Sequence, residues 1–153
     1  MELVKIFLTS GLTIVGGVLV FTLGQLIQKF LLEPVHEQSK ALGEIDFGLT
    51  YYAQWYANPG TGTPEHMAAA SDAIRRSASQ LRATTHAIHC YDLCERWGLV
   101  PVRQNLEEAV GDLIRISNSI HTGNGRENSQ DADHVRKLLA VRERRWYLTG
   151  RWK

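Results

Sequence analysis

The sequence predicts an all-α protein in which an N-terminal transmembrane helix continues, past a kink at Pro34, into a small cytoplasmic helical bundle. Between Lys5 and Lys29 the chain has 23 uncharged, mostly apolar residues. After them, apolar residues recur at intervals of three and four, as in amphipathic helices, and no stretch alternates with a period of two. A chain of 153 residues is long enough for one domain with an appendage. We therefore expect a transmembrane helix (residues 1–33), a helical bundle (residues 34–141) and a basic, aromatic tail (residues 142–153).

The uncharged N-terminal run has the length of a membrane anchor. As a helix it would extend about 35 Å, which exceeds the roughly 30 Å of a bilayer's hydrocarbon core. A cleaved signal peptide is one alternative, but its apolar region would cover only about 7–15 residues before a small-residue cleavage site. A buried helix of a soluble protein is the other alternative. We expect an uncleaved anchor that contacts lipid in the cell membrane.

Basic residues near the ends of the anchor indicate its orientation. Lys29 and Lys40 follow the apolar run, whereas Lys5 alone precedes it. Because cytoplasmic flanks carry an excess of Lys and Arg, we expect the N-terminus outside and the C-terminal domain in the cytoplasm. The net charge of +1 gives no global field that would attract nucleic acid or anionic lipid.

Helical stripes and turn signals divide the bundle. Apolar positions at helical spacing cover residues 35–57, namely Val35, Leu42, Ile45, Leu49, Tyr52 and Tyr56. Pro64 is suited to the first turn of the next helix. The core stripe of that helix contains Met67, Ala70, Ile74, Ala78, Leu81, Thr85 and Ile88. A short helix covers 91–97 before Gly98. Pro101 opens a further helix, whose stripe contains Leu106, Ala109, Val110, Leu113, Ser117 and Ile120. We expect a polar loop over 121–131 and a last helix over 132–141.

Small residues follow one face of the predicted anchor. The helical register of residues 35–56 extends backwards, unbroken, to Ser10, Gly17, Gly24 and Gln28. Helices in a bilayer associate where small residues allow close approach and polar side chains find partners. We therefore predict that these four residues form an interface between identical copies. A ring of copies could enclose a pore, and a lone anchor is the alternative.

The segment LRATTHAIHCYDLC carries most of the residues suited to chemistry. Arg75, Arg82, His86 and His89 fall along one flank of the predicted helix. Arg82 and His89 are the candidate catalytic pair, since their seven-residue separation would place them on the same face two turns apart. A basic flank that is solvated, or that binds another subunit, is the alternative, with Arg75 and His86 as candidate binding residues.

Asn118 and a set of histidine and cysteine residues are further candidates for polar contacts or metal binding. Asn118, beside an apolar face, either binds a side chain of a neighbouring helix, Arg82 or His86, or caps its own helix. His86, Cys90 and Cys94 recur every four residues, but three turns are too long for one ion, so we expect no metal and no cofactor. Two cysteines are also too few for a disulfide framework.

The C-terminal tail interleaves arginine with aromatic residues. Arg144, Arg145 and Trp146 are its candidate binding residues. Such a segment suits an anionic membrane face or single-stranded nucleic acid, and a basic end without a binding role is the third possibility.

The layout resembles that of known membrane proteins. The stretches GLTIVGGVLVFTLGQLIQKFLLEPVHEQ, QLRATTHAI and LIRISNSI resemble short bacterial single-pass helical proteins of uncharacterised type. The whole chain also resembles the HEPN-like membrane accessory proteins of type VI-B CRISPR systems, and Arg82 and His89 fit the Arg-x(4–6)-His spacing of HEPN ribonucleases. That resemblance implies a ring-shaped pore in antiviral defence, or RNA cleavage by Arg and His of two protomers.

Three functions follow from these observations. We favour a non-enzymatic, single-pass membrane protein that homo-oligomerises through its transmembrane helix and forms a pore in antiviral defence. The second hypothesis is a membrane-tethered HEPN-like ribonuclease that acts on RNA. The third is a membrane-anchored adaptor that recruits a soluble protein partner.

Overall fold

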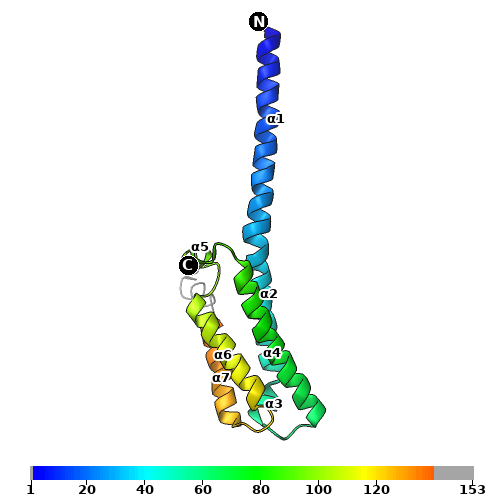
Figure 1. Cartoon of the computed structure of the whole chain (residues 1–153), viewed down its shortest axis with the longest axis vertical. Helices are drawn as coiled ribbons and strands as arrows, with labels where there is room; N and C mark the ends of the chain where they lie inside the picture. Colours follow the sequence, from blue (N-terminus) through cyan, green and yellow to red (C-terminus); the bar gives the residue numbers. More distant parts are fainter. Residues whose placement is uncertain (1, 140–153) are drawn as a thin grey trace, which may run out of the picture.

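A long helical rod leads into a bundle of shorter helices (Figure 1). The computed structural model describes residues 2–139. The rod consists of α1 (Glu2–Ile27), a π turn η1 (Gln28–Leu32) and α2 (Glu33–Tyr51), which follow one another without a break. The described residues contain no strand, so the predicted all-α class is confirmed.

The rod contains the one helix in the described part of the chain that is long and apolar enough to cross a membrane. This candidate span extends over Ser10–Tyr51, with a mean hydropathy of 1.8 in its most apolar window and none of that window buried. The alternative that this run is a buried helix of a soluble protein therefore does not agree with the structure of the chain. A signal sequence near the N-terminus would satisfy the same criteria of length and composition.

Pro34 lies inside the rod, directly after the π turn. The N–H of Glu33 donates to the carbonyl of Gln28, five residues earlier, instead of the usual four. A proline within a helix has no N–H to donate, and its ring crowds the carbonyl four residues before it. The wider turn ahead of Pro34 accommodates this, and π turns are among the recognised places where helices bend.

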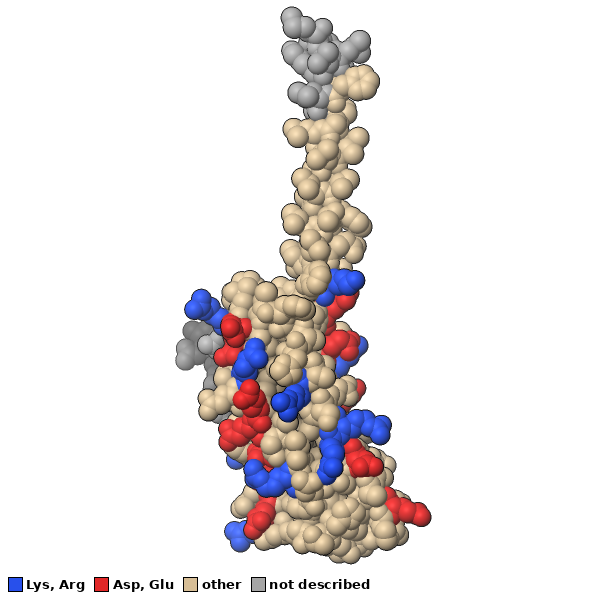
Figure 2. Space-filling model, viewed as in Figure 1, with Lys and Arg blue, Asp and Glu red and all other residues tan. Residues whose placement is uncertain are grey.

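The bundle packs α4 (Pro64–Ala87) between α2 and α6 (Arg103–Ser119). On its other side, α6 packs against α7 (Gly125–Leu139), and α7 also contacts the short α3 (Ala53–Ala57). The six-residue α5 (Tyr91–Arg96) lies at the end of the bundle from which the rod departs (Figure 1). Figure 2 shows acidic and basic residues interspersed over this face of the bundle, whereas the stretch of the rod between Lys5 and Lys29 carries none.

The predicted core stripes are confirmed in α4 and α6. All seven stripe positions of the segment from Met67 to Ile88 are buried. In and after α6, five of the six predicted positions are buried, and Val110 is half-buried at the edge of the core. The start of α4 is also as expected: Pro64 is its first residue, and the hydroxyl of Thr63 accepts a hydrogen bond from the N–H of His66 (3.3 Å).

The first stretch of the bundle differs in detail from the prediction. α2 ends at Tyr51, and Tyr52 separates it from α3, so no single helix covers residues 35–57. The buried positions of α2 are Gln38, Ala41, Ile45 and Leu49, while the predicted Val35 and Leu42 are half-buried beside them. The buried face of α2 is therefore rotated slightly about the helix axis from the predicted face.

The prediction of a polar loop over residues 121–131 is wrong from Gly125 onwards, because α7 begins there. Asn124 precedes the helix, and its side-chain oxygen accepts a hydrogen bond from the N–H of Arg126 (3.0 Å). A Cβ on Gly125 would collide with the carbonyl of Ala57. Glycine therefore lets the helix start in close contact with the end of α3. Arg144, Arg145, Trp146 and the rest of the tail lie outside the described residues.

Candidate functional site

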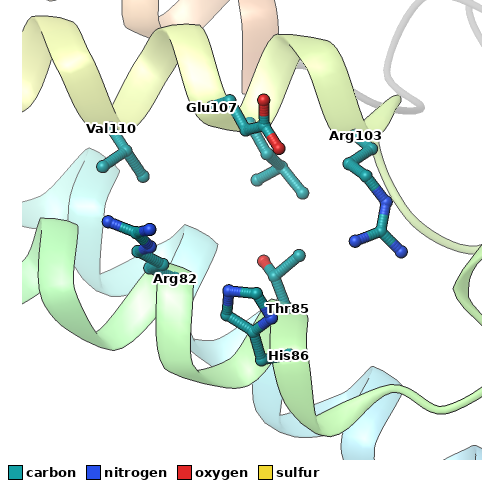
Figure 3. A pocket seen from close by; sticks show the side chains of 7 residues that line it. Arg82, Thr85, His86, Arg103, Glu107 and Val110 are labelled. Atoms are coloured by element: carbon teal, nitrogen blue, oxygen red, sulfur yellow. The ribbon is translucent and has the colours of Figure 1, made fainter.

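A pocket of about 370 Å³ lies between α4 and α6. α4 contributes Arg82, Thr85 and His86, and α6 contributes Arg103 and Glu107 (Figure 3). In each helix the two ionisable residues are four positions apart, so they occupy adjacent turns of one face. The remaining lining, from Leu106 and Val110, is apolar.

Three ionisable side chains of this pocket have no partner within the described part of the chain. Among the described residues, neither Arg82 nor His86 nor Glu107 makes a hydrogen bond or an ion pair. Some other arginines of the bundle are paired: Arg115, for example, binds the carboxylates of Asp112 (2.7 Å) and Asp131 (2.8 Å). The pocket therefore combines free hydrogen-bonding capacity with an apolar lining.

Arg103 is already in contact with two residues outside the pocket lining. Its guanidinium lies 4.5 Å from the centre of the Tyr91 ring and 3.9 Å from the carboxylate of Asp92. Tyr91 is buried and donates a hydrogen bond to the carbonyl of Pro101 (2.7 Å). Burial raises the pKa of Tyr91 to about 12, and the carboxylate of Glu95 adds to this effect, so the ring beneath Arg103 stays neutral at physiological pH.

The pocket suits an anionic group. Two guanidinium groups and an imidazole face a single carboxylate, and guanidinium binds phosphate and carboxylate through parallel hydrogen bonds. Imidazole next to arginine is also a combination that general acid–base chemistry on a phosphodiester would use. The geometry is thus compatible with binding and, for a nucleic acid, with catalysis.

The predicted pair of Arg82 and His89 does not share a helix face. α4 ends at Ala87, and the ring of His89 turns back so that its Nδ1 lies 3.1 Å from the carbonyl of Ala87. On its other side this ring meets Phe30 of η1 edge-on, with centroids 6.1 Å apart. Within one chain, His86 is the histidine that accompanies Arg82 in the pocket.

Arg75 and Asn118 bind each other. The guanidinium of Arg75 donates to the side-chain oxygen of Asn118 and to the hydroxyl of Ser117, at 3.1 Å for the latter. Ser71, one turn earlier, donates to the carbonyl of Ser117 (2.8 Å). Asn118 therefore finds a partner on a neighbouring helix, as one hypothesis held, but the partner is Arg75 rather than Arg82 or His86. These residues join α4 to α6.

The regular spacing of His86, Cys90 and Cys94 is broken in the structure. His86 is in the last turn of α4, exposed Cys90 precedes α5, and Cys94 is buried within it. Because the chain turns between α4 and α5, these residues do not follow one helix face. No group of three or more potential metal ligands occurs in the part of the chain that the structure describes.

The predicted interface on α1 lies entirely at the surface of the single chain. Ser10, Gly17, Gly24 and Gln28 are all exposed. A Cβ added at Gly17 or Gly24 would meet no atom within 4 Å among the described residues. The interface itself stays a prediction.

No protein-family model, curated protein sequence or solved structure matches this chain. The site must therefore be interpreted from its own geometry.

Sequence reasoning found half of the pocket. It singled out Arg82 and His86 because both fall along one flank of a predicted helix, although it paired Arg82 with His89. It missed Arg103 and Glu107, although these also recur with a spacing of four at the start of a helix. Their relevance depends on α6 packing against this end of α4, which spacing within one segment does not reveal.

Proposed function

We propose that this protein is a single-pass membrane protein that homo-oligomerises through α1. The observation that carries the proposal is the exposure of the rod: its apolar window is unburied, while the bundle below has its own core. Such a helix needs an apolar environment that its own chain does not provide. A bilayer supplies it.

The small residues of α1 support self-association within that bilayer. Lipid tails are as apolar as leucine, so helices in a membrane associate by close packing rather than by hiding apolar surface. Ser10, Gly17 and Gly24 recur every seven residues on a regular helix, and such a repeat favours a left-handed crossing. Gln28, four residues beyond Gly24, offers a polar group at the end of the same face.

A finer proposal concerns the assembly. A ring of copies would enclose a channel lined by the small and polar face of α1, with the N-terminus outside and the bundles in the cytoplasm. The layout shared with the CRISPR-associated membrane proteins supports a role of this channel in antiviral defence.

The test is the subunit count of the detergent-solubilised protein, measured by light scattering. Gly17→Leu/Gly24→Leu should shift the protein towards the monomer, because two isobutyl groups would hold neighbouring backbones apart. Gly11→Leu/Gly16→Leu is the matched control, since these glycines are equally open but lie on the flanks of the predicted face. An unchanged subunit count in the first variant, or the same loss in both, would refute the interface.

Release of a trapped dye from liposomes tests the pore. Wild-type protein should release the dye, and Gly17→Leu/Gly24→Leu should not. If the protein forms an oligomer but the liposomes stay sealed, the pore is refuted and the proposed self-association stands. Survival of cells challenged with phage, with and without the protein, tests the role in defence.

The pocket favours a second candidate, an anchored module that binds an anionic group of a soluble partner or of RNA. Its support is that Arg82 and His86 have no partner among residues 2–139 and lie beside an apolar lining. A short labelled single-stranded RNA, added to the purified full chain, is the probe for both binding and cleavage.

Arg82→Gln should weaken RNA binding roughly tenfold, the equivalent of about 1.4 kcal/mol, while Arg76→Gln should leave it unchanged. Arg76 is an exposed arginine of α4 outside the pocket. Cleavage lost in Arg82→Gln would indicate a ribonuclease, and binding without cleavage an adaptor. If neither binding nor cleavage occurs, RNA is not the ligand of the pocket.

A further inference from the structure

A short amphipathic helix at the end of the bundle presents a second apolar face to the outside. Within α5, Tyr91 and Cys94 are buried against the core. Leu93 and Trp97, four positions apart, are instead exposed to 42% and 58%. Arg96, between them on the same face, is also exposed. The core of the bundle therefore does not account for this side of α5.

This face lies at the level where the rod would leave a bilayer. Lys29 ends the run of 23 uncharged residues and so marks the boundary of the hydrocarbon core. Phe30, the next residue, contacts the ring of His89, and α5 begins two residues after His89. Figure 1 shows α5 beside the junction of the rod and the bundle.

Contacts between α2 and α4 hold the end of α4, which α5 follows in the chain, beside the rod. The side chain of Gln38 in α2 donates to the hydroxyl of Thr85 in the last turn of α4 (3.0 Å), and both residues are buried. α2 and α4 pack along one another. A membrane that surrounds α1 therefore meets α5 without any rearrangement of the bundle.

We propose that the exposed face of α5 rests on the lipid headgroup layer beside the rod, an inference that depends on α1 being a membrane anchor. Tryptophan is enriched at membrane interfaces, where its ring contacts the acyl chains and its N–H stays hydrated. Leu93 adds apolar area next to it. Arg96 can extend its charged end to lipid phosphates while its methylene groups cover apolar surface.

Charge near this face supports a headgroup contact rather than deep insertion. Asp92, 97% exposed on its side chain, would oppose burial in hydrocarbon, and it lies 3.9 Å from the guanidinium of Arg103. Glu95 is occupied as well, since its carboxylate accepts a hydrogen bond from the N–H of Arg103 (3.2 Å). Arg96 has no such partner among the described residues and is free for lipid phosphate.

The natural tryptophans supply both a probe and a control. Trp97 belongs to the proposed contact, whereas Trp55 lies in α3, near the other end of the bundle, stacked on His66. The full chain is reconstituted in vesicles of phosphatidylcholine and phosphatidylglycerol whose acyl chains are brominated near the headgroup. One variant keeps Trp97 alone (Trp55, Trp146 and Trp152→Phe), and the other keeps Trp55 alone (Trp97, Trp146 and Trp152→Phe). Circular dichroism establishes that both variants retain their helices.

We expect brominated lipid to reduce the emission of Trp97 strongly and to leave that of Trp55 unchanged. Arg96→Glu in the Trp97-only chain should lower this quenching on the anionic vesicles. Equal emission of Trp97 in brominated and ordinary lipid would overturn the contact. So would equal quenching of both tryptophans, since the whole bundle would then lie on the membrane.

Extraction with alkaline carbonate separates this inference from the proposed anchor. If the protein stays in the vesicles while Trp97 is not quenched, the proposed anchor stands and the α5 contact is refuted. If the protein is washed off, both proposals are refuted. If Trp97 is shielded from aqueous iodide and yet insensitive to brominated lipid, a second copy of the chain covers the face, which also overturns the proposal.

Discussion

Buried polar side chains connect the helices of the bundle at defined points. Gln38 binds Thr85, Ser71 binds the carbonyl of Ser117, and Asn128 binds the carbonyl of Tyr56. Every buried side-chain nitrogen or oxygen in the described part of the chain has a hydrogen-bond partner. Because an unpaired buried group is costly, such contacts favour one arrangement of helices over its alternatives.

Asn128→Ala should destabilise the bundle. Asn128 is 2% exposed, donates to the carbonyl of Tyr56 at 2.9 Å and accepts from the hydroxyl of Ser119. Its removal leaves the carbonyl of Tyr56 unpaired, at a cost of about 1–3 kcal/mol, whereas the hydroxyl of Ser119 keeps the carbonyl of Ile116 as an acceptor (3.1 Å). Urea unfolding of the full chain in detergent, followed by circular dichroism, measures the loss. Asn58→Ala, at an exposed asparagine that bonds only within its own turn, should change the stability by no more than about 0.5 kcal/mol.

Tyr91 should make the bundle sensitive to alkali. Its folded-state pKa is about 12 because burial disfavours the phenolate, whereas an unfolded tyrosine has a pKa of about 10. Between these values the unfolded chain releases a proton that the folded chain keeps. Stability is therefore fully present below about pH 10 and falls as the pH rises towards 12.

Comparison with Tyr91→Phe isolates this effect from other titrations. At pH 8 the variant should be less stable than the wild type by about 1 kcal/mol, because the hydrogen bond to the carbonyl of Pro101 is lost. Above about pH 10 the difference should shrink, since phenylalanine has no proton to release. A constant difference from pH 8 to pH 11.5, measured as urea midpoints, would contradict the raised pKa.

Individual buried polar residues could not be predicted from the sequence. Glutamine is found mainly at protein surfaces, and Gln38 becomes a core residue only because the hydroxyl of Thr85 meets it from 47 residues further along the chain. The partners of Arg75 were missed for the same reason. A pairing across helices depends on which turns face each other, and spacing within one helix carries no such information.

At the scale of helices, periodicity predicted the core faces well. The stripes of α4 and α6 are long and regular, and packing on one side makes the predicted residues the buried ones. Periodicity failed at α7, where the sequence from His121 to Asp131 is almost entirely polar. Only Asn128, Ala132 and Val135 are buried there, so the helix presents too narrow an apolar stripe to be recognised.

Two isoleucines of α6 test how the core face stabilises the bundle. Ile116 is 0% exposed and Ile114, two positions earlier, is 41% exposed. Ile116→Ala should cost about 2–5 kcal/mol, from lost apolar burial and from the cavity that it leaves. Ile114→Ala should cost less than about 1 kcal/mol. Equal losses, measured by thermal unfolding in detergent, would mean that α6 does not pack as described.

At the scale of the whole molecule, α1 stands apart from the hydrophobic core of the bundle. The core is formed by α2 to α7 and the segments between them, and it includes no residue of α1. The sequence was sufficient to predict the long apolar N-terminal helix and the bundle, because both depend on patterns within continuous segments. The level of α5 beside the rod was not predictable, since it follows from the packing of α2 against α4.

Because α1 lies outside this core, we predict that the bundle folds without α1. A chain of residues 29–153 keeps α2 to α7 together with Phe30 and Leu31, which contact the bundle, and removes the exposed apolar surface of α1. It should be soluble, helical and cooperative in thermal unfolding, because no core contact is lost. It should also be monomeric by light scattering, since the proposed contact between copies lies in α1. A truncated chain that forms the same oligomer as the full chain would place the interface in the bundle. A truncated chain without a cooperative transition would show that α1 contributes to the fold after all.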